Sequence, residues 1–287
     1  MDTLSAMRGE RITASVAYHG EGPVFSARWG GLRFVDMLAG DVLSLAADGT
    51  VTRKHVGRIA AALRPRRGGG AVIGIERGFA LEGPDGSLRA LPPLWADETV
   101  RMNEGACDPD GRFYCGSMAT DRRPGAGALY RLDPDGTTHL VLDAVTISNG
   151  LDWSPDGSRA YYVDTPTQRI AVFAYREGEL REPRTFASID EADGHPDGLA
   201  VDAEGGVWVA LNGGGAVRRY TADGRLDRIV EVPARRVTAC TFGGPGLDEL
   251  YVTTSREDLV PGDDPLAGSI FRARPGLRGQ PTREFAG

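Results

Sequence analysis

Three observations predict an all-β chain that folds as a six-bladed β-propeller with four-stranded antiparallel blades. Short apolar runs rich in valine, tyrosine, phenylalanine and leucine alternate with turn signals along the 287 residues, whereas helical periodicity is scarce. Eight Asp-Gly pairs are spread from Asp48-Gly49 to Asp223-Gly224, and such pairs between apolar runs are typical of hairpins. An internal repeat with a spacing of 41 to 48 residues has the length of a propeller blade.

Three clear copies of the repeat share a small polar residue beside glycine, an aspartate, a turn glycine and an aromatic strand. They begin at Asn103, Asn149 and Asp197, 46 and 48 residues apart. Glu21 lies 82 residues before Asn103, a weaker unit at 71–81 fills that interval, and a last unit begins near Thr238. Each unit alone would leave a sheet face bare, so the six units must pack side by side around an axis.

The repeat extends over the whole chain, which predicts a single propeller domain over residues 1–287. A strand-like stretch at about 11–18 precedes the first full unit, and the last unit continues into Ser269–Ala273. We expect the N-terminal strand to complete the last blade and close the ring, because closure would hide two sheet edges.

Composition excludes several classes of partner. The net charge of −7 and the pI near 5.2 argue against non-specific nucleic-acid binding and against an anionic membrane surface. No apolar run is long enough to cross a bilayer, and no signal peptide is visible at the start of the sequence. The three cysteines fit no zinc spacing and suit a reducing compartment, so we expect a cytoplasmic protein. The oligomeric state stays open.

Four residues stand at equivalent positions in their repeats: Glu21, Asn103, Asn149 and Asp197. In a propeller the innermost strands run along the central channel, so residues at their starts converge on one mouth. Carboxylate and amide oxygens are ligands of hard cations such as Ca²⁺, Mg²⁺ or Mn²⁺. Asp or Asn beside glycine is also common in ordinary turns, but the register shared across the repeats favours a site.

Other polar residues near these positions have two interpretations. Arg101 lies two residues before Asn103, which places both side chains on one strand face, although a surface arginine near Asp97-Glu98 is the alternative. His195 could shuttle protons for Asp197, but we expect a loop residue at the channel mouth. Arg122-Arg123 lies in a loop rich in proline and glycine, where it is either solvated or available to an anionic substrate.

An ordered set of motifs covers nearly the whole chain: Glu21-Gly22-Pro23-Val24, Arg101-x-Asn103-x-Gly105, Ser148-Asn149-Gly150-Leu151-Asp152-Trp153-Ser154, Pro196-Asp197-Gly198 and Cys240-Thr241-Phe242-Gly243-Gly244. This set resembles the SMP-30/gluconolactonase/regucalcin-like family. The resemblance implies a six-bladed propeller with one divalent cation in its channel, bound by Glu21, Asn149 and Asp197. It also implies that Arg101 and Asn103 contact the substrate, and that Asp197 is the catalytic base in the hydrolysis of sugar lactones.

The sequence departs from the family pattern at the channel rim. The family commonly has Asn-Asp-Gly-Lys where this chain has Asn103–Ala106, and its lid segment often carries glutamates where this chain has Ala119–Arg123. Both changes concern the identity of the substrate more than the metal.

The expected function is metal-dependent hydrolysis of a small, sugar-type lactone to the hydroxy acid. Calcium is the first expectation for the cation, with zinc, magnesium or manganese as alternatives. A phosphotriesterase-like hydrolase with the same site, and a non-enzymatic calcium-binding propeller, are the alternative functions.

Overall fold

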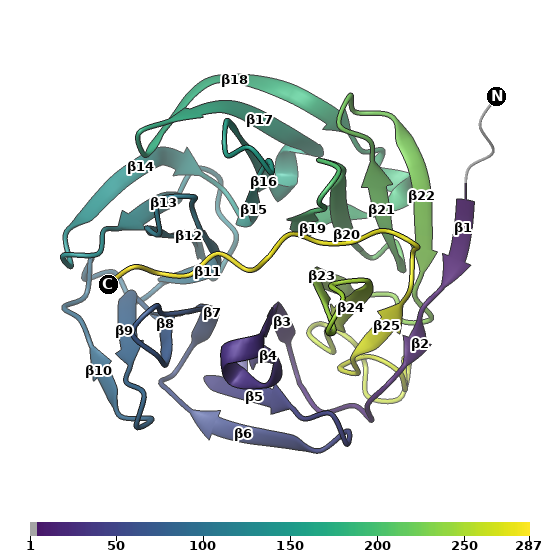
Figure 1. Cartoon of the computed structure of the whole chain (residues 1–287), viewed down its shortest axis with the longest axis horizontal. Helices are drawn as coiled ribbons and strands as arrows, with labels where there is room; N and C mark the ends of the chain where they lie inside the picture. Colours follow the sequence, from purple (N-terminus) through teal and green to yellow (C-terminus); the bar gives the residue numbers. More distant parts are fainter. Residues whose placement is uncertain (1–4) are drawn as a thin grey trace.

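The computed structural model describes residues 5–287 and confirms the six-bladed β-propeller. Six sheets are arranged in a ring around a central channel, and consecutive sheets follow one another along the chain (Figure 1). Within these residues there is no α-helix, only four single-turn 3₁₀ segments. None of the helical segments in this part of the chain is long and apolar enough to cross a membrane.

The blades are numbered here in chain order, each from its innermost strand outward. Blade 1 contains β3 (Gly20–Ser26), β4 (Gly31–Asp36), β5 (Asp41–Leu45) and β6 (Val51–His55). Blade 2 contains β7 (Ala60–Pro65), β8 (Ala71–Ile75), β9 (Gly78–Glu82) and β10 (Leu88–Ala90). Blade 3 contains β11 (Val100–Cys107), β12 (Phe113–Ala119), β13 (Gly127–Leu132) and β14 (Thr138–Val145).

The second half of the ring repeats this arrangement. Blade 4 contains β15 (Ser148–Trp153), β16 (Arg159–Asp164), β17 (Arg169–Arg176) and β18 (Glu179–Ser188). Blade 5 contains β19 (His195–Val201), β20 (Val207–Asn212), β21 (Ala216–Tyr220) and β22 (Leu226–Glu231), and blade 6 contains β23 (Val237–Gly243), β24 (Glu249–Thr254) and β25 (Phe271–Ala273). The 3₁₀ segments are η1 (Ala27–Trp29), η2 (Met37–Ala39), η3 (Thr165–Thr167) and η4 (Glu191–Asp193).

The N-terminal segment joins two blades. β1 (Ser5–Arg8) adds to the outer edge of blade 5 by parallel pairing with β22, and β2 (Glu10–Arg11) pairs antiparallel with β25 as the outermost strand of blade 6. The closing strand is therefore shorter and earlier than the expected 11–18. The strand-like composition there reflects packing instead, because Ile12 and Val16 lie against the buried cluster around Phe34 and Leu43.

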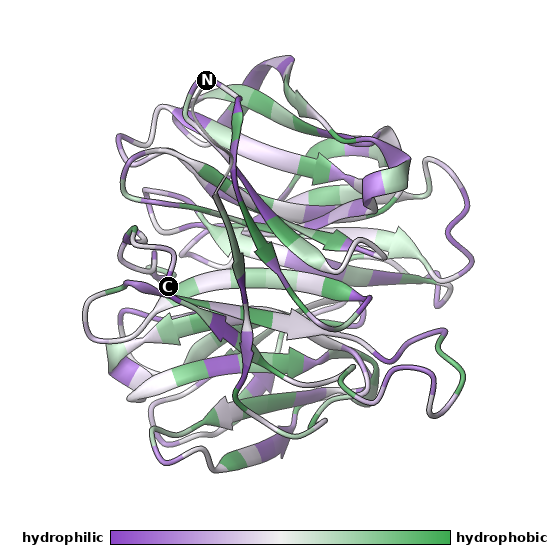
Figure 2. Cartoon of the chain, turned by 90° about the vertical axis from the view of Figure 1, so that its right-hand side faces the viewer, coloured by the Kyte–Doolittle hydropathy of each residue, from purple (hydrophilic) through white to green (hydrophobic). Residues whose placement is uncertain are grey.

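Apolar side chains fill the spaces between neighbouring blades. Trp153 of blade 4 is fully buried and meets the ring of Tyr114 of blade 3 edge-on at 5.3 Å between centroids, and Trp208 of blade 5 meets Phe242 of blade 6 in the same way at 5.5 Å. Along the ribbon, hydrophobic residues concentrate on the strands and hydrophilic residues on the connecting loops (Figure 2). The three cysteines are free thiols within this core.

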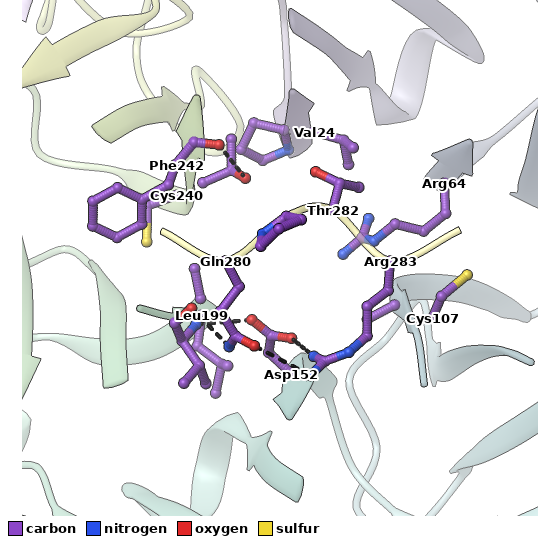
Figure 3. A pocket seen from close by; sticks show the side chains of 16 residues that line it. Val24, Arg64, Cys107, Asp152, Leu199, Cys240, Phe242, Gln280, Thr282 and Arg283 are labelled. Atoms are coloured by element: carbon purple, nitrogen blue, oxygen red, sulfur yellow. Dashed lines mark hydrogen bonds and ion pairs between the residues drawn. The ribbon is translucent and has the colours of Figure 1, made fainter. Parts of the chain in front are cut away.

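Residues 277–287, here called the C-terminal strap, cross the channel at the mouth where the inner strands end (Figure 1). The strap makes at least one hydrogen bond to each of the six blades, through Ala203 N–Arg278 O, Gly279 N–Leu247 O, Gln280 Nε2–Trp153 O, Thr282 Oγ1–Phe25 O, Phe285 N–Pro65 O and Ala286 N–Gly111 O, all between 2.6 and 2.9 Å. Beneath the strap a cavity of about 70 Å³ remains, where Arg283 approaches Asp152 at 3.3 Å (Figure 3). This mouth is closed.

Candidate active site

The opposite mouth, where the inner strands begin, contains the residues that the sequence singled out. The pairing of β11, β15 and β19 with the next strand shifts register at Asn103, Asn149 and Asp197, and that of β3 shifts directly after Glu21. Such bulges re-aim side chains next to active sites. All four side chains are buried, and together with Arg101 they line one pocket of about 490 Å³. The structure therefore brings together all five residues.

Side chains on the second strands of blades 1 and 4 fix the segments that lead into the site. The carboxylate of Asp36, at the end of β4, accepts hydrogen bonds from the backbone N–H groups of Tyr18 and His19, which precede β3. Asp164, at the end of β16, accepts in the same way from Thr146 and Ile147, which precede β15. These contacts hold the starts of two inner strands in place.

A chain of hydrogen bonds connects three of the blades across the pocket. Arg101 Nη1 donates to Asn103 Oδ1 at 2.7 Å, and Asn103 Nδ2 donates to Asn149 Oδ1 at 2.9 Å. Asn149 Nδ2 donates to Thr165 Oγ1 at 2.7 Å, and that hydroxyl donates to the carbonyl of Pro196. These hydrogen bonds fix the amide oxygen of Asn149 within the site, and this oxygen keeps a second lone pair for another partner.

Neither carboxylate of the set has a cationic partner among the residues that the structure describes. Glu21 Oε2 accepts from the backbone N–H of Gly22 at 3.1 Å, and Asp197 Oδ2 accepts from Asn212 Nδ2 at 3.0 Å. Asp197 Oδ1 is buried and has no hydrogen-bond partner within residues 5–287. Burial raises the pKa of Asp197 to about 8, with repulsion from Glu104 and Glu257 adding to it. Burial, followed by repulsion from Asp197 and Glu104, also raises the pKa of Glu21.

This donor set fits a hard divalent cation. An orphaned carboxylate oxygen, a second carboxylate and a fixed amide oxygen share one pocket, and a cation among them would relieve the repulsion between the acids. In the described part of the chain no three histidine, cysteine, aspartate or glutamate side chains form a metal cluster. The fit therefore depends on the amide of Asn149 as well as on Glu21 and Asp197.

Glu104 is a residue of the channel that sequence reasoning missed. Its side chain is buried, it accepts a hydrogen bond from the backbone N–H of Gly105 at 3.0 Å, and burial raises its pKa. Blades 4 and 5 have Gly150 and Gly198 at the same place in the bulge, where an added Cβ would come within 2.6 Å of the next blade. The signal was present in the repeat alignment, since Glu104 is the charged residue at a position otherwise held by glycine.

Two histidines occupy different environments in the pocket. His19 is buried, its Nδ1 lies 2.7 Å from Ser255 Oγ, and its Nε2 lies 3.9 Å from Glu21 Oε1. Burial, together with the nearby arginines, lowers the pKa of His19 to about 3, so the ring is neutral. His195 is exposed at the mouth, as expected, with Nδ1 3.1 Å from Gln168 Oε1, but it is the first residue of β19 and not a loop residue.

Comparison with known proteins agrees with the fold and the motifs. The sequence pattern of the SMP-30/gluconolactonase/LRE-like region matches residues 19–256. A Bacillus subtilis protein named "Putative sugar lactone lactonase YvrE" is 33% identical over 277 residues, which cover 93% of this chain and 95% of the relative. Human regucalcin is 33% identical over 299 residues, covering 99% of this chain and 100% of the relative.

Among solved structures, that of a calcium-binding protein, regucalcin, from Agrobacterium tumefaciens superposes with a TM-score of 0.92. The two sequences are 28% identical, and the superposition covers 99% of each chain. The match of the family pattern to most of the chain, the shared motifs and the common propeller lead to one conclusion. The chain belongs to the SMP-30/gluconolactonase/LRE-like family.

Proposed function

We propose that this protein is a metal-dependent lactonase that hydrolyses a small, sugar-type lactone to the hydroxy acid. The observation that carries the proposal is the pair of buried carboxylates, Glu21 and Asp197. They face one pocket beside the amide oxygen of Asn149, and neither has a cationic partner in the described part of the chain. Membership of the family and the name of the Bacillus subtilis relative support a lactone as the substrate.

Glu21, Asn149 and Asp197 would hold the cation. Calcium is the first choice because the ligands are oxygens and because a relative of the same fold is named as calcium-binding; zinc, magnesium and manganese remain alternatives. When bound, a divalent cation polarises a carbonyl group and lowers the pKa of water.

Asp197 is the proposed base. Asn212 holds Oδ2, and a bound cation would offset the burial and repulsion that raise the pKa of Asp197, so the ionised carboxylate could accept a proton from the attacking water. The water oxygen bonds to the lactone carbonyl carbon, the bond from that carbon to the ring oxygen breaks, and Asp197 returns its proton to the ring oxygen. The product is the ring-opened hydroxy acid.

Arg101 and Asn103 are the proposed substrate contacts. The hydrogen bonds of Arg101 to Asn103 and to the carbonyl of Met102 come from Nη1, so other N–H groups of the guanidinium can face a substrate oxygen or a developing oxyanion. Asn103 already uses both amide hydrogens, on Ser148 O and Asn149 Oδ1, so it can accept a hydrogen bond from a sugar hydroxyl through Oδ1.

The test is acid release from glucono-1,5-lactone above its spontaneous hydrolysis, with chelator-treated protein and each of the four cations added back. We expect turnover that depends on the cation. Turnover of a fluorophosphate but of no lactone would establish a phosphotriesterase instead. A cation that raises only the melting temperature, without turnover of either class, would establish a binding protein.

A further inference from the structure

Three arginines line the same pocket. Arg101 is buried on β11, whereas Arg122 follows β12 and Arg236 precedes β23, and both are more exposed, at the mouth. Arg122 and Arg236 take no part in the reaction proposed above.

Arg122 reaches across the mouth from blade 3 to blade 6, which lie on opposite sides of the ring (Figure 1). Its Nη2 lies 2.9 Å from Asp258 Oδ2 and 3.9 Å from Glu257 Oε1. Its backbone adopts a left-handed conformation with φ of 59°, held by a hydrogen bond from its N–H to Ala119 O. The side chains of Arg122 and Asp258 are 51% and 50% exposed, and an ion pair so open to water is weak enough to exchange partners.

Arg236 depends on the same carboxylate. Its Nη2 lies 3.7 Å from Asp258 Oδ2, and within residues 5–287 its guanidinium donates no hydrogen bond. Two guanidinium groups therefore share one half-exposed carboxylate, which leaves unused N–H donors at the mouth. Guanidinium groups bind carboxylate and phosphate oxygens through two parallel hydrogen bonds.

The other polar groups of the rim balance charge but do not occupy these donors. Glu257 Oε1 lies 3.9 Å from Arg122 Nη2, beyond hydrogen-bond distance, and its Oε2 lies 3.5 Å from His19 Nδ1, so it offsets charge without using the N–H groups of Arg122. Glu191 is exposed on η4, on the side of His195 and Gln168 between blades 4 and 5. The guanidinium donors of the mouth therefore lie on the side of Asp258, away from Glu191.

We propose that the substrates of this protein are lactones with an anionic substituent, a carboxylate or a phosphate, which Arg122 and Arg236 bind at the mouth. The lactone ring lies below, where Arg101 and Asn103 contact it. This inference rests on the proposed lactonase activity and adds the class of substrate. Binding of the anion displaces Asp258 from the two guanidinium groups.

The experiment compares matched pairs of lactones on the cation-loaded protein. Glucono-1,4-lactone and glucaro-1,4-lactone differ by a carboxylate, and glucono-1,5-lactone and its 6-phosphate differ by a phosphate. We expect the anionic member of at least one pair to have a kcat/KM higher by about tenfold, mainly through a lower KM. The pair that shows the preference identifies the anion. The preference should weaken with added salt.

Variants assign the preference to residues. Arg122→Gln and Arg236→Gln should each lower the ratio of anionic to neutral kcat/KM by about tenfold. Asp258→Asn should raise the ratio, because it frees both guanidinium groups. The matched control is Arg123→Gln, since Arg123 points away from the pocket to Asp97 and Asp121, at 3.2 and 3.0 Å, and should leave the ratio unchanged.

A second measurement does not depend on turnover. Calorimetric binding of 6-phosphogluconate to the cation-loaded protein should weaken about tenfold in Arg122→Gln and stay unchanged in Arg123→Gln. Wild-type ratios at or below one in both pairs, or ratios that survive both arginine substitutions, would overturn the inference while leaving the lactonase in place. Failure to hydrolyse any of the four lactones would instead refute the lactonase itself.

Discussion

The two mouths of the channel are built from the same six inner strands but differ in how their polar groups are satisfied. At the strap side, the C-terminal residues hydrogen-bond to every blade, and Phe285 is buried among the apolar residues of blades 2 and 3. At the open side, Asp197 Oδ1 has no hydrogen-bond partner among the described residues, and two buried carboxylates repel each other. The closed mouth therefore holds the ring rigid, and the open mouth keeps the unsatisfied groups that a ligand needs.

The largest effect expected from this difference follows from removing the negative charge of Asp197 at the open mouth. Asp197→Asn keeps the shape of the side chain but removes the proposed base and a cation ligand, so kcat/KM for the lactone should fall about 10³-fold or more. Steady-state kinetics at saturating cation measure the loss. Asp190→Asn, an exposed change on the same approach segment that preserves the cap of η4, is the matched control and should retain wild-type activity. Comparable activity of the two variants would refute the role of Asp197.

The corresponding change at the closed mouth should act on stability instead. Phe285 is 1% exposed, so Phe285→Ala should lower the free energy of unfolding by about 3–5 kcal/mol. Thermal unfolding checks this, with a drop on the order of 10 °C expected for a domain of this size. Leu140→Ala, at a residue 56% exposed, should leave the melting temperature nearly unchanged. A Phe285→Ala protein as stable as wild type would show that the strap does not hold the ring.

The raised pKa of Asp197 should also lower the stability of the metal-free protein at neutral pH. Folded Asp197 keeps its proton up to about pH 8, whereas the unfolded chain releases it near pH 3.8. The unfolded state therefore binds fewer protons between these values, and wild-type stability falls as the pH rises through this window. Metal-free Asp197→Asn should be more stable than wild type by up to a few kcal/mol at pH 7, and equal to it near pH 3. Denaturant unfolding at both pH values tests this; a pH-independent difference would contradict it.

A smaller effect should follow from a single contact of the strap. Gln280 Nε2 donates to Trp153 O at 2.9 Å and to Val201 O at 3.1 Å, and so joins blades 4 and 5. Gln280→Ala should cost about 1 kcal/mol of stability, with lactone kinetics unchanged. Denaturant unfolding measures the difference, and Gln280→Glu, which cannot donate both bonds, should resemble the alanine variant. A loss of activity without a loss of stability would mean that the two mouths are coupled.

The propeller could be predicted because the spacing of the repeats is read along the sequence and requires no knowledge of long-range contacts. Asn103, Asn149 and Asp197 each lie in the first half of an inner strand, at its bulge, so aligning the units placed them at one mouth before any contact was known. Glu104 was missed because its neighbours Asn103 and Gly105 completed the motif. Its burial on the channel axis becomes visible only when the blades are assembled.

The ends of the chain could not be predicted in the same way. The strap has no apolar periodicity, and its bonds join residues far apart in the sequence, such as Thr282 and Phe25. At the other end, the strand-like composition of 11–18 reflects packing, because Ile12 and Val16 lie against blade 1 outside any strand. Apolar composition indicates burial, whereas hydrogen-bond pairing depends on which sheet edge the fold leaves free.

The most direct measurement is the number of cations bound per chain, determined by equilibrium dialysis of the chelator-treated protein against calcium. Wild type and the Asp190→Asn control should bind one ion, and Glu21→Gln and Asp197→Asn should each lose it at the same free concentration. The same series with zinc, magnesium and manganese identifies the preferred ion. One ion retained in both carboxylate variants, or none bound by the wild type from any of the four metals, would contradict a metal centre at the open mouth.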